Sequence, residues 1–434
     1  MMVKMKGHNT MEITKTKRDK FIFFLIVLQP IIDIITSISS YYGMAITIGS
    51  LSRALIMAGL VVYIFRYLFR YKRAMILPFA VSYAPILLML IVNGLQKTPV
   101  AYFQEINFAI KTSYYLVMIH ASIILLQQRI INKALLYQSA AVVSLIVGIS
   151  YWLAIMTGTS IDSYRHGSVG FSGWFFSANE LSVIVIVLLG LSLVYLWYEQ
   201  RFRTWLAFIL MVSMVPMIGT KTAFFGGLFI VLAGVLYVLF TFRFRIVREK
   251  SALLFLSIVV LFVCCIPLSP IFSNTKQMDY VTDVEHTEKV ADPNRTSGLA
   301  GKILSSRDIY LQQTKTDYTE ATNTRKLFGL GYAGDYTEAP KLIEMDFFDL
   351  FFGYGVIGSI LLVMPLIYLI TQLLKGIFPL NIRKFLLLLT LGLCLGIAFL
   401  AGHVLFAPSV ISYVTICILG LGMENVEVNK DGVT

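Results

Sequence analysis

Three carboxylates stand close together in the segment "IEMDFFDLFFGYGVIG", residues 343–358. They are Glu344, Asp346 and Asp349, and the residues that follow them are almost wholly apolar. A carboxylate at the mouth of an apolar segment loses part of its hydration, which raises its pKa towards that of a useful base, while nearby cations lower it. The three residues are therefore candidates for taking a proton from an attacking hydroxyl group.

The composition of the whole chain indicates an all-α polytopic membrane protein. Hydrophobic residues make up 57% of the 434 residues, charged residues make up only 14%, and the mean hydropathy is +0.78. A soluble domain carries about 25% charged residues. The apolar residues fall in blocks of about twenty, the length that a helix needs to cross a hydrocarbon core of about 30 Å. We predict twelve spans, at residues 21–42, 43–65, 75–94, 105–127, 135–157, 179–198, 204–220, 222–240, 251–272, 347–373, 385–404 and 406–422.

The distribution of Lys and Arg predicts the orientation of these spans. Every connection on one side is basic, whereas the short connections on the other side hold only Lys97, Arg165 and Lys221. Cytoplasmic connections are the basic ones, so both termini are predicted to be cytoplasmic and the cytoplasmic membrane of a bacterium is the expected location. The predicted regions are a tail at 1–20, spans at 21–272, an extracytoplasmic catalytic loop at 273–346, spans at 347–422 and a tail at 423–434.

Several classes of function are disfavoured by the same data. The net charge of +12 comes from cations that flank spans, where orientation and anionic lipid headgroups account for them. No stripe of basic and aromatic residues on a soluble domain predicts nucleic-acid binding. The four cysteines all lie in predicted spans, which suggests neither a disulfide framework nor a zinc site. We expect no metal and no cofactor.

The outer side of the predicted membrane protein gathers the polar residues. In the long loop, "SSRDIYLQQT" (305–314) predicts a helix that contains Arg307, and "LFGLGYAGDY" places three glycines at turn-permissive positions. Two shorter outer segments contribute Arg165 and Lys221. Arg and Lys bind phosphate groups through charge-assisted hydrogen bonds. These three cations, opposite the carboxylates, predict a site for an anionic, lipid-attached substrate.

In their order and sidedness, these motifs resemble the O-antigen ligase and polymerase superfamily over most of residues 135–422. Members show Arg-x-x-Gly with aromatics and Asn before a span, and here the chain reads "RHGSVGFSGWFFSAN". They show a Ser-Arg-Gly-like junction between two spans, and here "GTKTAFF" places Lys221 where Arg is common. They carry Ser-Gly-Arg, a short helix and then Gly-x-Gly in the large loop, and here these are "SSR" and "GLG" (329–331).

The last motif of that superfamily departs from the usual pattern. Members carry His-Asn some residues before an acidic residue and a Gly-rich span entry. Here "EMDFFDLFFGYGVIG" fits the frame with Glu344 at the histidine position and Gly353 at the acidic position. A glutamate supplies no positive charge there. The departure favours a polymerase of capsule, exopolysaccharide or teichuronic-type glycan over transfer to lipid A.

The resemblance implies a type C membrane glycosyltransferase that acts on undecaprenyl-diphosphate-linked oligosaccharide by an inverting, metal-independent transfer. It implies that Arg307, with Arg165 and Lys221, binds the diphosphate and neutralises the charge of the leaving group. Glu344 would deprotonate the acceptor hydroxyl. If it does not, Asp346 or Asp349 would. The implied partners are the lipid-linked substrate, membrane lipids, and possible flippase and chain-length proteins of the same pathway.

Structural roles compete with these functional ones. Asp346 is placed to cap a helix, and Asp349 in its first turn would interact favourably with the helix dipole. Lys221 is alternatively an interfacial lysine whose stem lies in lipid. His166 and His403, near the outer ends of spans, are expected to be packing or interface histidines.

Two charged residues fall near the middle of predicted spans. Asp33 and Arg53 lie well inside the first and second spans, and intramembrane charges are functional or paired by default. We predict that they form a structural ion pair. Lys111 lies near the start of the fourth span, close to Glu105 in sequence, and is expected to line the cavity that holds the lipid diphosphate.

Transport is the rival class of function, for example a flippase for lipid-linked oligosaccharide. Many transporters contain two related halves with a binding site at the midplane of the membrane. No convincing repeat relates residues 1–200 to residues 200–422, and the polar residues gather at the outer face. A polymerase of peptidoglycan type is a further alternative, and these loop motifs fit the O-antigen group better.

Overall fold

The computed structural model describes residues 17–44, 47–128, 131–163, 170–243, 249–273, 307–335 and 341–431. A single antiparallel sheet of β1 (Ile161–Asp162) and β2 (Phe171–Gly173) interrupts an otherwise helical chain in these residues. The α-helices are α1 (Lys17–Tyr41), α2 (Ile48–Tyr71), α3 (Ile76–Gln96), α4 (Tyr102–Gln128), α5 (Lys133–Met156), α6 (Ala178–Tyr198), α7 (Phe202–Met217), α8 (Lys221–Arg243), α9 (Glu249–Cys265), α12 (Arg307–Glu320), α13 (Asn323–Phe328), α14 (Asp346–Lys375), α15 (Ile382–Leu400) and α16 (Pro408–Asp431). Two short 3-10 helices are η1 (Arg73–Met75) and η2 (Ile266–Leu268).

A helix lies at each of the twelve predicted spans. Ten helices in the described part of the chain are long and apolar enough to cross a membrane. The two others are α7, an apolar helix of 16 residues, and α16, whose last turns carry charged residues. The structure therefore confirms a polytopic helical membrane protein, and twelve crossings stay a prediction.

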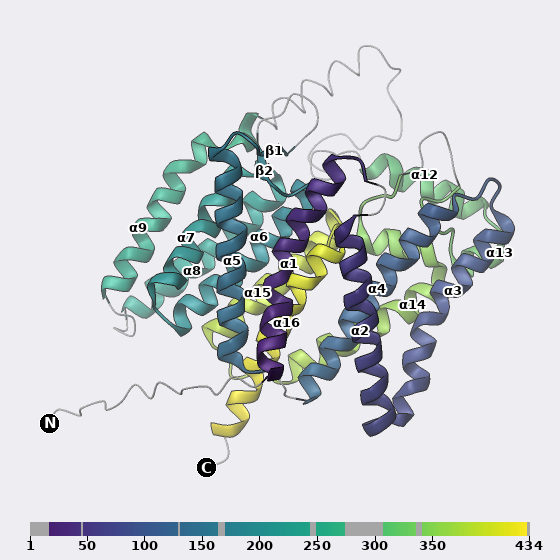
Figure 1. Cartoon of the computed structure of the whole chain (residues 1–434), viewed down its shortest axis with the longest axis horizontal. Helices are drawn as coiled ribbons and strands as arrows, with labels where there is room; N and C mark the ends of the chain where they lie inside the picture. The colour runs from purple at the N-terminus through teal and green to yellow at the C-terminus, as the bar shows by residue number, and fades with distance from the viewer. Residues whose placement is uncertain are drawn as a thin grey trace.

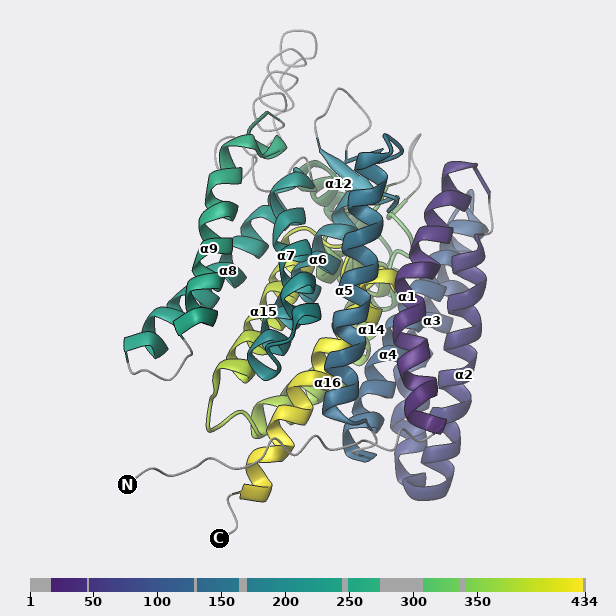
Figure 2. The same ribbon diagram turned by 60° about the vertical axis from the view of Figure 1, so that its left-hand side comes forward.

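Helix α6 forms the centre of the bundle. It packs against α5, α7, α8, α15 and α16, and 89% of its most apolar window is buried, compared with 11% for α2. A helix that is apolar on every side can lie at the centre of the bundle, as α6 does, or at its lipid-facing edge, as α2 does. Both the protein interior and lipid hydrocarbon lack water. Helices α2 and α9 lie at opposite edges of the bundle in Figure 2.

The two ends of the bundle differ. The start of α1 and the end of α16 lie at one end, whereas α12 of the long loop lies at the other (Figures 1 and 2). The N-terminus of α14, whose first turn carries Asp346 and Asp349, lies beside α12 and thus away from the start of α1 and the end of α16. Which of the two ends is cytoplasmic stays a prediction from the Lys and Arg distribution.

Helix α14 is broken near its start, and the glycine pair of the long loop fills the break. Gly355 has φ 67° and ψ −172°, which interrupts the helical hydrogen bonds. The freed carbonyl of Phe352 accepts the N–H of Leu330 at 2.8 Å, and that of Gly353 accepts the N–H of Gly331 at 3.0 Å. A buried carbonyl without a partner costs free energy, so the "GLG" segment stabilises the broken helix and is in turn positioned by it.

Candidate functional site

Glu344 lies in the short segment that leads into α14, and Asp349 holds this segment in place. The buried Asp349 carboxylate accepts the N–H of Ile343 at 2.9 Å and that of Met345 at 3.1 Å. Glu344 has a φ of 63°, a left-handed conformation that costs a residue with a side chain roughly 1–2 kcal/mol. Such strain persists only where surrounding contacts enforce it, and it is frequent at functional sites.

Asp346 does the same for the connection between α15 and α16. Its two carboxylate oxygens accept the N–H groups of three consecutive residues, His403 to Leu405, at 3.0, 2.9 and 2.7 Å. His403 has a φ of 61° and is a second strained residue. The two aspartates of one helical turn therefore fix the backbones of Glu344 and His403 side by side.

The alternative in which Asp346 caps α14 is corrected by the structure. Met345 is the residue before the first turn, and no side chain makes a capping hydrogen bond there. Asp346 instead lies inside the first turn and bonds to a different part of the chain. Asp349 is also in the first turn, where a carboxylate interacts favourably with the helix dipole.

Three basic side chains surround the Glu344 carboxylate, and we call Arg307, Lys341 and His403 the cation cluster. Arg307 donates from Nε to the backbone carbonyl of Glu344 at 3.0 Å, and its Nη2 lies 3.7 Å from Oε2. Lys341 Nζ lies 3.5 Å from Oε1, and His403 Nε2 lies 3.6 Å from Oε2. These separations are ion-pair distances, so the carboxylate is shared among the cations and is not bound closely by any one of them.

The charges of this cluster shift the pKa values of its members. Burial raises the pKa of Glu344, but the neighbouring His403, Lys341 and Arg307 outweigh it and lower the pKa to about 2. Burial lowers the pKa of His403, but the carboxylates of Glu344, Glu180 and Asp346 raise it above its usual value. At neutral pH, Glu344 is therefore ionised, and the fraction of His403 that is protonated is greater than for a free histidine.

The cluster borders a cavity of about 480 Å³ between the first helices and the loop segments. Its walls come from α1, α2, α4, the start of α6 with the residues just before it, and the segments 341–346 and 403–409. Glu344, Lys341 and His403 line it, and so do Asp33 and Arg53. One cavity thus joins the strained outer loops to the charged pair inside the bundle.

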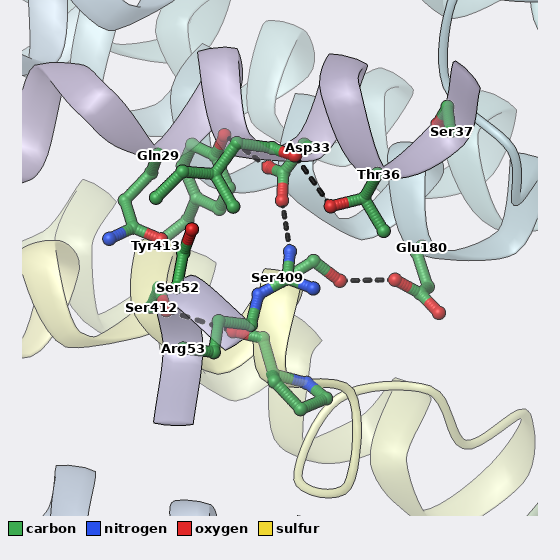
Figure 3. A network of polar contacts seen from close by, with 12 residues as sticks. Gln29, Asp33, Thr36, Ser37, Ser52, Arg53, Glu180, Ser409, Ser412 and Tyr413 are labelled. Carbon is green, nitrogen blue, oxygen red and sulfur yellow. Dashed lines mark hydrogen bonds and ion pairs between the residues drawn. The ribbon is translucent and has the colours of Figure 1, made fainter. Parts of the chain in front are cut away.

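The predicted ion pair between Asp33 and Arg53 is confirmed. Arg53 Nη2 donates to Asp33 Oδ1, and Tyr413 donates to Asp33 Oδ2 at 2.7 Å (Figure 3). Close by in the same view, Ser409 donates to Glu180. Asp33 and its partners therefore join α1, α2 and α16 through a carboxylate that has two donors, which is how a buried charge is tolerated.

Removal of one member of this pair is expected to destabilise the protein more than removal of both. Asp33→Asn or Arg53→Gln leaves a buried charge without its partner, a loss of about 3–5 kcal/mol, whereas the double variant leaves two neutral amides. We expect each single variant to be scarce in membranes and the double variant to recover abundance and thermal stability. Arg66→Gln, on the exposed face of α2, is the control. A double variant no more abundant than the singles would contradict the prediction.

A second buried ion pair attaches the long loop to α3 and α4. Lys97 Nζ contacts Glu105 Oε1 at 2.6 Å and donates to the carbonyl of Tyr332 at 3.0 Å. Glu105 Oε2 accepts the N–H of Tyr332 at 2.9 Å. Tyr332 lines the cavity, so this attachment places one wall of it. The closest partner of Glu105 is therefore Lys97 and not Lys111.

The remaining predicted cations have different positions. Lys111 lines the cavity, as expected, and makes no hydrogen bond or ion pair with any residue that the structure describes. Lys221 is the first residue of α8 and is not among the residues that line the cavity. Arg165, with His166, lies outside the described residues. The structure therefore brings Arg307 and Lys111, of the four predicted diphosphate ligands, to or beside the cavity.

Sequence reasoning missed two members of the cation cluster. His403 was expected to be a packing or interface histidine, and Lys341 was not singled out. The available signal was their position in the sequence, because "AGHVLFAPS" is predicted to be an outer connection and Lys341 lies just before the carboxylate motif. Among the described residues, no group of His, Cys, Asp and Glu is arranged to hold a metal ion.

Comparison with known proteins gives one family. A family model described as "O-antigen ligase like membrane protein" matches residues 15–427, which is nearly the whole chain. No curated protein matches the chain.

Proposed function

The chain belongs to the O-antigen ligase-like family of membrane proteins, and from this premise we propose that it polymerises undecaprenyl-diphosphate-linked oligosaccharide on the outer face of the cytoplasmic membrane. The family comprises membrane enzymes of surface polysaccharide assembly. The finer assignment to a polymerase is supported by Glu344, which stands where ligase-like members carry histidine.

The observation that carries the proposal is the cation cluster around Glu344 in the wall of the cavity. Arg307, Lys341 and His403 all lie within 3.7 Å of one carboxylate. The same three cations, with Lys111 of the cavity lining, provide donors for a diphosphate. Charge placed in advance where a leaving group becomes negative stabilises the transition state.

The proposed reaction is an inverting glycosyl transfer. A hydroxyl of the acceptor sugar attacks the anomeric carbon of the donor sugar on the face opposite the diphosphate. The new glycosidic bond forms as the bond between the anomeric carbon and the diphosphate oxygen breaks, and undecaprenyl diphosphate leaves with its electron pair. The hydroxyl proton passes to Glu344, because 29% of its side chain is exposed, whereas Asp346 and Asp349 are buried and bond to backbone N–H groups.

Substrate binding would turn Glu344 into an effective base. At rest its pKa of about 2 makes it a weak base, and the cause is the surrounding positive charge. A bound diphosphate attracts Arg307, Lys341 and His403 and neutralises them. Burial then dominates and raises the pKa of Glu344 towards the range in which a carboxylate accepts a proton efficiently. The Glu344 carboxylate thus neutralises the cation cluster until the bound diphosphate takes over that role.

Disruption of the gene, followed by analysis of surface glycan, tests the proposal. We expect long polymer to disappear and single lipid-linked repeat units to accumulate on the outer face of the membrane. Accumulation of these units on the inner face would instead identify a flippase, and long polymer that stays unattached would identify a ligase. Plasmid-borne wild-type protein should restore the polymer and serves as the control.

A further inference from the structure

The cavity has a second part in which carboxylates outnumber the one basic group. Around the cation cluster, three basic groups face the single carboxylate of Glu344. Deeper in the bundle, Arg53 is paired with Asp33, and the carboxylate of Glu180 also lines the wall. A diphosphate is drawn to the excess of positive charge and is repelled by the carboxylates of the second part. The two parts therefore suit different portions of a substrate.

Hydroxyl groups cover the wall above the Asp33–Arg53 pair. They come from the last turns of α1, the residue before α2 and the first turn of α2. We call this part of the cavity the hydroxyl chamber: Thr36, Ser37, Ser40, Thr47 and Ser50. The Ser40 hydroxyl makes no hydrogen bond with any described residue. The Ser37 hydroxyl accepts the N–H of Phe176 at 2.6 Å, which leaves its own proton free to donate.

Aromatic rings complete the lining. Phe175 and Phe176 come from the segment before α6, and Phe406 comes from the connection between α15 and α16. Phe176 has 46% of its surface exposed, so its ring is accessible. Hydroxyls and carboxylates bond to the edges of a sugar ring, while aromatic rings cover its apolar C–H face.

We infer that the hydroxyl chamber is a saccharide subsite, which binds a neutral sugar ring of the lipid-linked oligosaccharide while the cation cluster binds the diphosphate. The inference rests on the proposed function for the identity of the lipid-linked substrate. An acidic headgroup is disfavoured by Asp33 and Glu180, and a lipid tail is disfavoured because burial of these polar groups against hydrocarbon would leave them without partners.

Binding measurements on the full chain in lipid nanodiscs test the subsite. The probes are undecaprenyl diphosphate and lipid-linked oligosaccharides extracted from the cells of origin, which share the headgroup and differ in the sugars.

The double variant Thr36→Val with Ser40→Ala removes two hydroxyls and keeps the side-chain shape with which residue 36 packs against Gly49. Ser40→Trp fills the chamber. The control is Ser39→Ala, because Ser39 is buried on α1, bonds to Ile35 and does not line the cavity.

We expect the wild-type protein to bind the glycosylated lipid more tightly than undecaprenyl diphosphate. The double variant should reduce that preference about thirtyfold, the effect of two hydrogen bonds of about 1 kcal/mol each, and Ser40→Trp should abolish it. Affinity for undecaprenyl diphosphate should not change in either variant, since neither residue belongs to the cation cluster.

An unchanged preference in the double variant, or no preference in the wild-type protein, would overturn the subsite. The proposed reaction fails in a different way. A wild-type protein that prefers the glycosylated lipid but forms no polymer from it would refute the polymerase and leave the saccharide subsite standing.

Discussion

Glu344→Gln is expected to abolish polymer formation while the protein stays folded and binds its headgroup more tightly. The amide has the shape of the carboxylate but takes no proton, so the rate should fall by about 10²–10⁴-fold. The same change removes the negative charge that the cation cluster balances. Affinity for undecaprenyl diphosphate should therefore rise, or at least not fall, as turnover is lost.

This opposite response of binding and turnover distinguishes a base from a residue that only holds the structure. The matched control is Glu320→Gln, on the exposed face of α12, which should leave both measurements unchanged. Arg307→Lys keeps the charge but loses the planar group that bonds to the Glu344 carbonyl, and it should weaken headgroup binding. Normal glycan synthesis by the Glu344→Gln protein would refute the assigned role.

The pH dependence of headgroup binding reports on His403. The folded-state pKa of this imidazole lies above its usual value of about 6.5, so its positive charge is fully present below that pH. The charge is lost as the pH rises through the raised pKa. Affinity for undecaprenyl diphosphate should accordingly be constant in mildly acidic buffer and fall in alkaline buffer, and His403→Gln should remove this dependence.

Gly329→Ala and Gly355→Ala are expected to unfold the region of the broken helix. A Cβ at Gly329 would lie 2.0 Å from the carbonyl oxygen of Gly353, and one at Gly355 would lie 2.6 Å from the backbone of Leu327. Both glycines have positive φ, 100° and 67°. The added Cβ would clash with backbone atoms, which cannot move aside as a flexible side chain would. Each variant should therefore lose about 2–4 kcal/mol or more of stability.

The measurement is thermal stability of the purified variants beside Gly396→Ala. Gly396 lies within α15, where a Cβ would meet nothing within 4 Å, and alanine there gains up to about 1 kcal/mol of helix propensity. The control should be as stable as the wild-type protein or more so. Equal stability of all three variants would show that the docked "GLG" segment does not hold α14 in its broken form.

The elements near the site show how far sequence reasoning reached. The short helix that contains Arg307 was predicted, and the structure forms it as α12. It could be predicted because the helix depends on the residues of its own segment. The pairing of Asp33 with Arg53 was also predicted, since an intramembrane charge requires a partner and few candidates existed. Lys111 was expected in the cavity and lies there. The roles of Asp346 and Asp349 were not foreseen, because their partners are backbone groups that no motif marks.

By itself the sequence determined the class of protein and the types of charged residue in the candidate site. Apolar blocks of span length, basic connections on one side, and carboxylates and cations on the other are read directly from residue order, because insertion in a bilayer depends on local composition. Only the tertiary structure decided which charges meet. Glu344 and His403 are separated by the whole of α14 and α15, and two buried carboxylates bring their backbones together. Electrostatic energy depends on distance through space, which the order of residues does not contain.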